Sequence, residues 1–288
     1  WVASESAACP RRTWALPALA REDGLALLSN QTCAVIGASV GGLGGQAARQ
    51  LAVLGCRVVL ATRTERACEA SREAVAAAAA AAGSGGSAEC LPPTDLGEPQ
   101  GAFSLAQHLA GGVNALVLSA AALGPYAPAS SQWRGSLRTS GHALSVALAV
   151  GHLAHALLVL LLAAAGALLP GCRVVFVSSG AAFGALEAAH AALRGGNYSA
   201  ASGSGQRNGD SAVGLGPGIA SEITHYKGIK LLNALFAVEL SRRAQLGGLG
   251  IDVAVAVPAV SAQTGLTRRY FADAAFRQHF LKRQGSVQ

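Results

Sequence analysis

The 288-residue chain lacks methionine altogether and begins with Trp1, so we expect it to be a processed form or a fragment of a longer protein. A targeting peptide or an N-terminal anchor would then be missing from it. Aromatic residues are also scarce, at 5%, and the net charge of +7 comes from scattered basic residues rather than from a basic stripe. This pattern argues against nucleic acid as a partner, whereas an anionic cofactor or a membrane surface would suit the positive charge.

No C-x-x-C pair occurs among the cysteines, which is the spacing typical of metal and redox sites. The six cysteines are widely spaced and mostly lie in apolar segments: Cys9, Cys33, Cys56, Cys68, Cys90 and Cys172. We therefore predict that they are small buried hydrophobic side chains rather than metal ligands or disulfides. No metal site is expected.

Long hydrophobic runs are rare in the chain, and residues 143–169 form the one that exceeds the roughly 20 residues needed to cross a bilayer. This run contains His152 and His155 and lies between two predicted strands. We expect a helix buried against a sheet, and a membrane span is the alternative. The two histidines are expected to be packing or interface residues, because no third metal ligand accompanies them.

What the chain does have is a regular alternation of strands and helices. The predicted strands are Thr32–Ile36, Arg57–Ala61, 88–91, 115–118, 173–177 and 252–257, and the predicted helices are 43–54, Glu65–Ala82, 99–110, 143–169 and 223–245. This order predicts an α/β fold with a doubly wound parallel sheet, in a single Rossmann-type domain over residues 31–267. We expect an N-terminal arm (1–30), a flexible polar insertion (181–222) and a C-terminal helical segment (268–288).

A glycine-rich turn follows the first strand and precedes a helix. It contains Gly37, Ser39, Gly42, Leu43 and Gly44. Glycine allows a pyrophosphate to approach the backbone closely, Ser39 can add a hydroxyl donor, and the helix N-terminus favours an anion. The turn therefore predicts a dinucleotide-binding site.

The same turn also fits the nucleophile elbow of α/β hydrolases, G-x-S-x-G, with Ser39 as the nucleophile. That alternative requires an acidic residue and then a histidine downstream. We favour it less, because the elbow normally follows several strands and this turn follows the first one.

The second strand ends at Thr62-Arg63-Thr64, where an NAD-binding chain would offer a carboxylate to the ribose. A guanidinium at this position suits a ribose 2′-phosphate, so Arg63 favours NADP(H) over NAD(H). A solvated loop arginine is the alternative. After the third strand, Asp95 and Leu96 could contact adenine, although Asp95 could equally cap a helix.

Tyr226 and Lys230 are one helical turn apart in an amphipathic segment. A phenol with a pKa of about 10 needs a nearby cation to transfer protons at neutral pH, and Lys230 would supply that cation. A helix start with a surface lysine is the alternative.

Three stretches resemble the short-chain dehydrogenase/reductase family. Residues 226–243 are similar to its Y-x-x-S-K-L-A-N-x-L-F-x-x-E-L-x-R-R, residues 151–158 to N-H-L-G-H-F-L-L, and residues 173–179 to its fifth strand. Within the family the chain is most similar to the retinol-dehydrogenase-like branch, whose plant members include a chloroplast-envelope dehydrogenase associated with protein import. The resemblance covers about residues 30–267.

The resemblance implies a role for each matching residue. Tyr226 would be the general acid/base, Lys230 would lower the tyrosine pKa and bind the nicotinamide ribose, and Ser179 would polarise the substrate carbonyl. Pro258 would lie beside the nicotinamide, and Thr264 would contact its carboxamide. Ser119 and Ala120 stand where the family has N-A-G after the fourth strand.

The chain also departs from the family pattern. Gly151 replaces the asparagine whose backbone holds a water of the proton relay, although its carbonyl remains. Ala259 replaces a glycine, and the glycine turn is one residue longer than usual. Ser179 and Tyr226 are also farther apart than is usual, because the polar insertion lies between them.

We expect an NADP(H)-dependent oxidoreductase that interconverts a carbonyl and an alcohol on a small apolar substrate. The alternative is a degenerate, non-catalytic member that serves as a nucleotide-binding or structural subunit of a larger complex. The partners that we consider are a second copy of the chain, in a homodimer, and a membrane surface. An organelle, such as the chloroplast, is the compartment that the resemblance implies.

Overall fold

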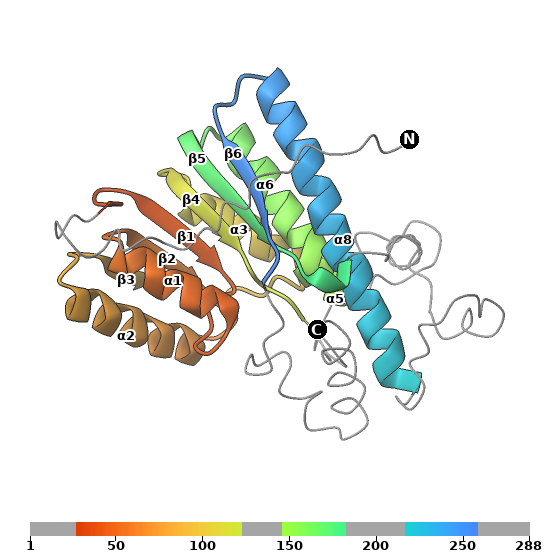
Figure 1. The fold of residues 1–288 in the computed structure, drawn as a ribbon, viewed down its shortest axis with the longest axis horizontal. Helices are drawn as coiled ribbons and strands as arrows, with labels where there is room; N and C mark the ends of the chain where they lie inside the picture. The colour runs from red at the N-terminus through yellow and green to blue at the C-terminus, as the bar shows by residue number, and fades with distance from the viewer. Residues whose placement is uncertain (1–26, 123–145, 183–216, 259–288) are drawn as a thin grey trace, which may run out of the picture.

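The computed structural model describes residues 27–122, 146–182 and 217–258, and for residues 146 and 217–225 it describes the backbone alone. Its centre is a six-stranded sheet in the order β3-β2-β1-β4-β5-β6 (Figure 1). Every neighbouring pair of strands is parallel. The predicted doubly wound parallel sheet is confirmed.

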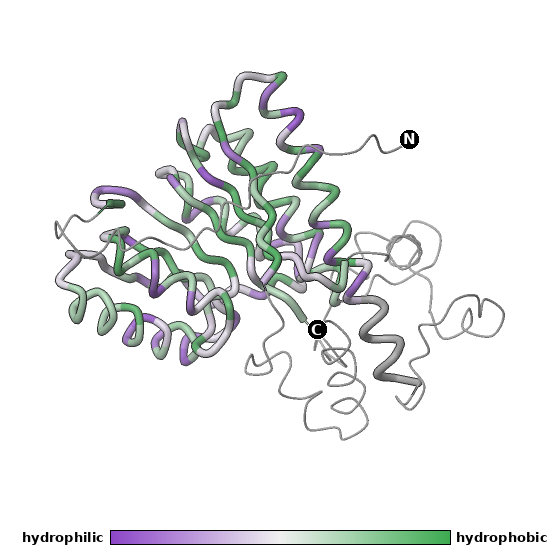
Figure 2. The backbone as a smooth tube through the Cα atoms, in the orientation of Figure 1, coloured by the Kyte–Doolittle hydropathy of each residue, from purple (hydrophilic) through white to green (hydrophobic). Residues whose placement is uncertain are grey.

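The strands follow the predicted positions closely. They are β1 (Thr32–Ile36), β2 (Arg57–Ala61), β3 (Ser87–Cys90), β4 (Val113–Leu118), β5 (Leu168–Val177) and β6 (Asp252–Ala256). Alternate residues of the central strands point to opposite faces, so that Ala34 and Ile36 join one hydrophobic cluster while Cys33 and Val35 join the other. Figure 2 shows hydrophobic residues concentrated along these strands.

Helices cover both faces of the sheet. They are α1 (Leu43–Val53), α2 (Glu65–Ala82), α3 (Pro99–His108), α5 (Val146–Leu148), the π-helical turn η1 (Ala149–Leu153), α6 (Ala154–Ala164), the 3-10 turn η2 (Gly180–Ala182) and α8 (Pro217–Leu246). Helices α1 and α2 pack on one face, and α3, α6 and α8 pack on the other (Figure 1). Both faces are therefore apolar, which explains why the strands read as nearly continuous hydrophobic runs.

The long hydrophobic run is not the predicted single helix, because its described part contains α5, η1 and α6 and then the start of β5. Helix α6 ends at Ala164, Gly166 adopts a φ of 65°, and Leu168 already pairs with Val113 in the sheet. A glycine in the left-handed region ends a helix, and apolarity alone does not reveal that break. Among the described residues, no helix has both the length and the apolar character needed to cross a membrane.

The cysteine prediction is wrong for four residues. Cys33 is bonded to Cys56, and Cys68 is bonded to Cys90. Cys33 lies in register with Val58, and Cys56 points to the same sheet face as Val58 because side chains alternate along a strand. The crossover through α1 or α2 therefore brings together cysteines that are far apart in sequence.

Cys172 is buried and free, as predicted, and burial raises the pKa of its thiol to about 11. Cys9 lies outside the described residues. So do most of the predicted arm (1–30), insertion (181–222) and C-terminal segment (268–288), which stay predictions. Helix α8 begins at Pro217, before the predicted start at residue 223, so the polar insertion ends earlier than expected.

Candidate active site

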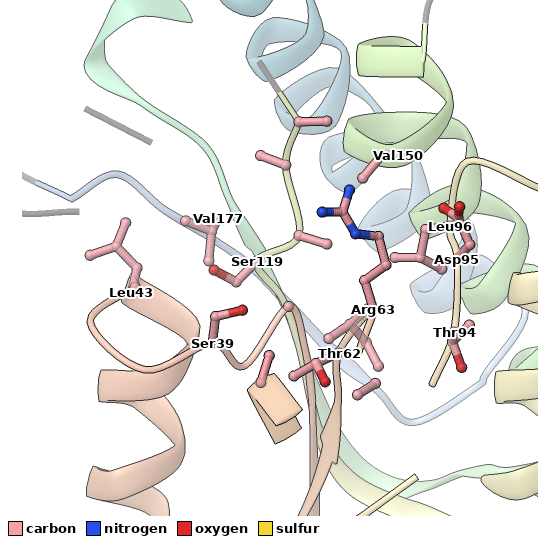
Figure 3. Close-up of a pocket in the computed structure, with 18 of the residues that line it drawn as sticks. Ser39, Leu43, Thr62, Arg63, Thr94, Asp95, Leu96, Ser119, Val150 and Val177 are labelled. Atoms are coloured by element: carbon pink, nitrogen blue, oxygen red, sulfur yellow. The ribbon is translucent and has the colours of Figure 1, made fainter. Parts of the chain in front are cut away.

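A cavity of about 530 Å³ lies at the carboxyl ends of β1, β2, β4 and β5. This is the edge where the strand order reverses between β1 and β4, and ligands of such sheets bind there. Most of the predicted site residues line the cavity: Gly37, Ser39, Gly42, Leu43, Arg63, Asp95, Leu96, Ser119, Ala120, Tyr226 and Lys230. Figure 3 shows several of these side chains around the cavity.

The glycine turn is shaped by close backbone contacts. A Cβ on Gly37 would lie 2.5 Å from the backbone nitrogen of Ala120, and one on Gly44 would lie 2.4 Å from the carbonyl oxygen of Gly37. Gly44 therefore holds α1 against β1 rather than lining the cavity. Gly41 adopts a φ of 77°, which accommodates the additional residue of the turn.

Helix α1 presents its N-terminus to the cavity. Its N-cap residue is Gly42, so no side chain caps the first turn, and both Gly42 and Leu43 line the cavity. The backbone N–H groups of a first turn have no partner within the helix, and together with the helix dipole they favour an anion. The turn is thus suited to a phosphate group, as predicted from its glycines.

Arg63 stands on the short loop between β2 and α2, and its side chain extends into the cavity (Figure 3). The loop is fixed from both sides. The Thr62 hydroxyl donates to the carbonyl oxygen of Thr64 at 2.9 Å, and the Thr64 hydroxyl accepts from the N–H of Ala67 at 3.3 Å, which caps α2. A guanidinium held at this place can bind a second anionic group beyond the glycine turn.

Asp95 faces the cavity but also stabilises its own turn. Its carboxylate accepts a hydrogen bond of 2.8 Å from the N–H of Gly97, shortly before α3 begins. Asp95 does not cap α3, because the N-cap of that helix is Glu98 and no side-chain capping bond is formed there, and Asp95 remains among the residues that line the cavity.

The three residues predicted to carry the chemistry come together despite the long insertion between them. The Ser179 hydroxyl is hydrogen-bonded to the Tyr226 side chain, and the Lys230 Nζ lies 5.5 Å from the centroid of the tyrosine ring. Burial raises the pKa of Tyr226, and the bond to Ser179 offsets part of that rise. The pKa of the phenol thus lies above its ordinary value, whereas the resemblance implies that Lys230 lowers it.

Lys230 is only 3% exposed, and its ammonium donates to the carbonyl oxygen of Val177 at 2.7 Å. Burial lowers the pKa of this lysine to about 8. The Ser178 hydroxyl in turn donates to the backbone carbonyl of Lys230 at 2.8 Å, which fixes α8 against the end of β5. The lysine is therefore a held cation that loses its proton more easily than an exposed lysine does.

Gly151 lies in the π-helical turn η1 and does not line the cavity, whereas its neighbour Val150 does. The Gly151 carbonyl accepts a hydrogen bond of 2.8 Å from the amide of Asn233, whose oxygen lies 2.8 Å from Nδ1 of His152. Asn233 is fully buried. It thus connects η1 to α8, the helix that also carries Tyr226 and Lys230.

The two histidines differ in their surroundings. Burial lowers the pKa of His152, and its bond to Asn233 acts in the opposite direction. His155 is fully buried, and neither ring nitrogen has a hydrogen-bond partner. Burial, with smaller contributions from Lys230 and His152, lowers the pKa of His155 to about 3, so the ring is neutral at physiological pH.

Five predicted site residues do not line the cavity or lie outside the described residues: Gly44, Gly151, Ser179, Pro258 and Thr264. Pro258 follows β6 but does not line the cavity, and Thr264 lies outside the described residues. The hydrolase alternative is not supported, because no histidine is found among the described residues that line the cavity beside Ser39. In the same part of the chain, no group of acidic, cysteine or histidine side chains could hold a metal ion.

Several residues that line the cavity were not predicted, most of them at or shortly after the end of a strand: Thr62, Thr94, Val177, Ser178 and, in η1, Val150. Their position after a strand was an available signal, because strand ends meet at one edge of a parallel sheet. Asn233 was missed for a different reason. Its partners are on another helix, and only the packing of η1 against α8 reveals its role.

No protein-family model matches the chain, and no curated protein sequence matches it. Solved structures do share its fold. A metagenomic short-chain oxidoreductase in complex with NADP superposes with a TM-score of 0.52 at 21% identity, over 81% of this chain and 84% of that chain. A putative short-chain alcohol dehydrogenase from Sinorhizobium meliloti 1021 gives 0.60 at 16% identity, over 90% and 82%.

The complex of Pseudomonas aeruginosa RhlG with NADP gives a TM-score of 0.57 at 18% identity, over 88% of this chain and 82% of that chain. These structures are all described as short-chain oxidoreductases or as NADP complexes. At such low identity the likeness establishes a shared fold, that of the short-chain dehydrogenases/reductases. A shared fold does not by itself establish the activity.

Proposed function

We propose that this chain is an NADP(H)-dependent short-chain oxidoreductase that interconverts a carbonyl and an alcohol on an apolar substrate. The observation that carries the proposal is the hydrogen bond between Ser179 and Tyr226 beside the buried Lys230, at the edge of a cavity that an uncapped helix N-terminus also enters. Two solved structures of the same fold contain NADP, which supports the choice of cofactor.

The residues of the cavity fit NADP(H). The uncapped first turn of α1 would hold the pyrophosphate, and Arg63 would hold the 2′-phosphate that distinguishes NADP from NAD. When bound, NADPH supplies the hydride that reduces a carbonyl carbon. Asp95 and Leu96 would line the adenine end, as expected from the sequence.

The chain's own residues would handle the proton. Ser179 would donate a hydrogen bond to the substrate oxygen, and Tyr226 would transfer its phenolic proton to that oxygen as the alcohol forms. The ammonium of Lys230 would stabilise the tyrosinate that remains, since it already lies against the tyrosine ring. Because burial raises the pKa of Tyr226, the phenol keeps its proton at neutral pH, which suits the reductive direction.

The cofactor assignment is tested by titrating the purified chain with NADPH and NADH while following nicotinamide fluorescence. We expect saturable NADPH binding that Arg63→Glu weakens by about tenfold or more, since a charge-assisted bond contributes roughly 1.5–3 kcal/mol. Arg66→Glu is the matched control, because Arg66 makes the same change of charge on the exposed start of α2 without lining the cavity. Absence of binding by either nucleotide would contradict the proposal.

A second function is favoured by one specific observation. Gly151, whose carbonyl would hold the relay water, does not line the cavity, and that carbonyl already accepts one hydrogen bond from Asn233. A non-catalytic subunit that binds the nucleotide would explain this arrangement. It predicts NADPH binding without NADPH oxidation across a panel of aliphatic and aromatic aldehydes and ketones, whereas the enzyme predicts turnover of at least one of them.

The finer expectations from the resemblance stay predictions. These are the retinol-dehydrogenase-like branch, the chloroplast compartment, the homodimer and the association with a membrane surface or a larger complex. An apolar substrate is supported by Val150 and Val177, which contribute apolar surface to the cavity on the side of η1 and β5.

A further inference from the structure

Both disulfides among the described residues lie in the half of the sheet that carries Arg63. Cys33–Cys56 joins the start of β1 to the residue before β2. Cys68–Cys90 joins the first turn of α2 to the last residue of β3. The two bridges thus brace two consecutive βαβ units, β1-α1-β2 at the start of its strands and β2-α2-β3 at the end of its last strand.

The two bridges differ in exposure. Cys33 and Cys56 are completely buried, and Cys68 is 2% exposed, whereas Cys90 is partly exposed. A thiolate in solution can attack a disulfide only at a sulfur that it can reach. Cys90 is the most exposed residue of the two bridges, so we expect a reductant to reach the Cys68–Cys90 bridge before the buried Cys33–Cys56 bridge.

The Cys68–Cys90 bridge connects two walls of the cavity. Cys68 directly follows Ala67, which lines the cavity on the same side as Arg63 and Thr64, and Cys90 shortly precedes the other wall at Thr94 and Asp95. Between β2 and the segment after β3, the main chain adds only the bonds from Leu91 N–H to Leu60 at 2.9 Å and from Thr94 N–H to Thr62 at 3.0 Å. The disulfide adds a covalent link between the first turn of α2 and the end of β3, while Val75 and Ala79 pack the rest of α2 into the core.

We propose that Cys68–Cys90 is a thiol–disulfide exchange site for a dithiol reductant, and that its redox state sets the affinity of the cavity for NADP(H). The oxidised form keeps the Arg63 wall and the Asp95 wall in the spacing that the nucleotide needs. The reduced form releases the first turn of α2 from β3 and weakens binding. The coupling to affinity rests on the proposed function, and the exchange itself does not.

The exchange is a balanced two-electron reaction. One thiolate of the dithiol attacks the sulfur of Cys90, the bond between the two protein sulfurs breaks, and Cys68 leaves as a thiolate that then takes a proton from solvent. The second thiolate of the dithiol attacks the mixed disulfide and releases Cys90. The dithiol is oxidised to its disulfide, and the protein gains two thiols.

The exchange is tested on the full chain with dithiothreitol under native conditions, followed by alkylation and peptide mapping. We expect Cys68 and Cys90 to be alkylated before Cys33 and Cys56. Reduction of Cys33–Cys56 first, or of both bridges together, would overturn the exchange site.

The coupling is tested by NADPH titration of the oxidised and reduced chain. We expect reduction to raise the dissociation constant by about five- to tenfold, the usual size of a coupling between sites. The double variant Cys68→Ser/Cys90→Ser should bind like the reduced chain and ignore dithiothreitol, whereas Cys33→Ala/Cys56→Ala should still respond. Equal affinity of the oxidised and reduced wild-type chain would overturn the coupling.

The two proposals fail in different ways. If neither redox form binds NADPH, the cofactor assignment and the coupling are both wrong, while the peptide map still decides the exchange site. If both forms bind NADPH equally well, the cofactor assignment stands and the coupling is wrong.

Discussion

Two buried polar side chains at the site donate hydrogen bonds to backbone carbonyls, and leaving either of them without a partner would destabilise the fold. Lys230 donates to Val177, and Asn233 donates to Gly151 while its oxygen meets His152. Such groups stabilise a structure only while they are paired, because their desolvation has already been incurred. Single substitutions at these positions therefore report directly on how the site is held together.

Asn233→Ala should reduce the free energy of unfolding by about 2–4 kcal/mol, because it leaves both the Gly151 carbonyl and a ring nitrogen of His152 unpaired. Urea denaturation of the variant and the wild type measures the loss. The matched control is Gln245→Ala on the exposed end of the same helix, which should change stability by less than about 0.5 kcal/mol. Equal effects of the two substitutions would show that the Asn233 bonds contribute nothing measurable.

Lys230 should impose a characteristic pH dependence on stability. Its pKa in the folded chain is about 8, below the ordinary value of 10.5, so the unfolded chain binds more protons between these values. Stability rises with pH wherever the unfolded state holds more protons, so the contribution of Lys230 is least favourable below pH 8 and improves above it.

We therefore compare the wild type with Lys230→Met by denaturation at several pH values. From about pH 7.5 to about pH 9.5, the wild type should gain about 2 kcal/mol relative to the variant. The comparison cancels the titration of groups that do not interact with Lys230. A difference between the two proteins that stays constant with pH would mean that Lys230 titrates normally.

At the scale of helices and strands, the π-helical turn η1 is where the second helical layer meets the site. Val150 of this turn lines the cavity, and Gly151 packs against Ile229 of α8. A single π-helical turn within a helix often marks a functional site, because it shifts the register of the side chains around it. Here it presents the Gly151 carbonyl to Asn233.

Gly151→Ala should destabilise the fold by about 1–3 kcal/mol, because a Cβ at this position would lie 2.9 Å from Cγ2 of Ile229. Ile229→Ala removes that atom, so the double variant should recover about 1 kcal/mol relative to the sum of the single variants. A double-mutant cycle by urea denaturation measures the coupling. Strict additivity would mean that the turn relaxes away from α8 without cost.

The elements that could be predicted from the sequence are those with local signals. The Thr32–Ile36 strand and the Glu65–Ala82 helix match their predicted bounds, since apolar runs flanked by glycine or by a capping threonine mark their ends. Residues 143–169 were predicted as one helix because the helical residues up to Ala164 and the first residues of β5 are both apolar. The break at Gly166 depends on the pairing of Leu168 with Val113, which is a tertiary contact.

The candidate site likewise contains residues that local sequence patterns predict and residues that depend on tertiary contacts. The glycine turn, Arg63 and the Tyr226–Lys230 pair are local patterns, and the structure places them around one cavity. Asn233 and the disulfides depend on crossover connections that bring distant residues together, so the spacing of cysteines in the sequence suggested that they were free. The hydrogen bond from Ser179 to Tyr226 likewise spans two separate elements.

At the scale of the whole molecule, the cavity joins two halves of one sheet. Strands β1 to β3 with α1 and α2 supply the glycine turn and Arg63, whereas β4 and β5 with η1 and α8 supply Ser178, Tyr226 and Lys230. A ligand that contacts both halves stabilises the complete fold rather than one element, because unfolding either half releases it. The proposed nucleotide binding would therefore be linked to global stability.

NADPH at about one hundred times its dissociation constant should raise the free energy of unfolding by about 2.7 kcal/mol, a gain that thermal denaturation detects as a higher Tm. Tyr226→Phe should keep that gain, because it removes only the hydroxyl that is bonded to Ser179 and leaves Lys230 on Val177. The same variant should lose NADPH oxidation with any aldehyde or ketone that the wild type reduces, because the proton donor is gone. Stabilisation and turnover that disappear together would mean that Tyr226 holds the nucleotide site rather than the chemistry, and turnover that survives would remove Tyr226 from the proton transfer.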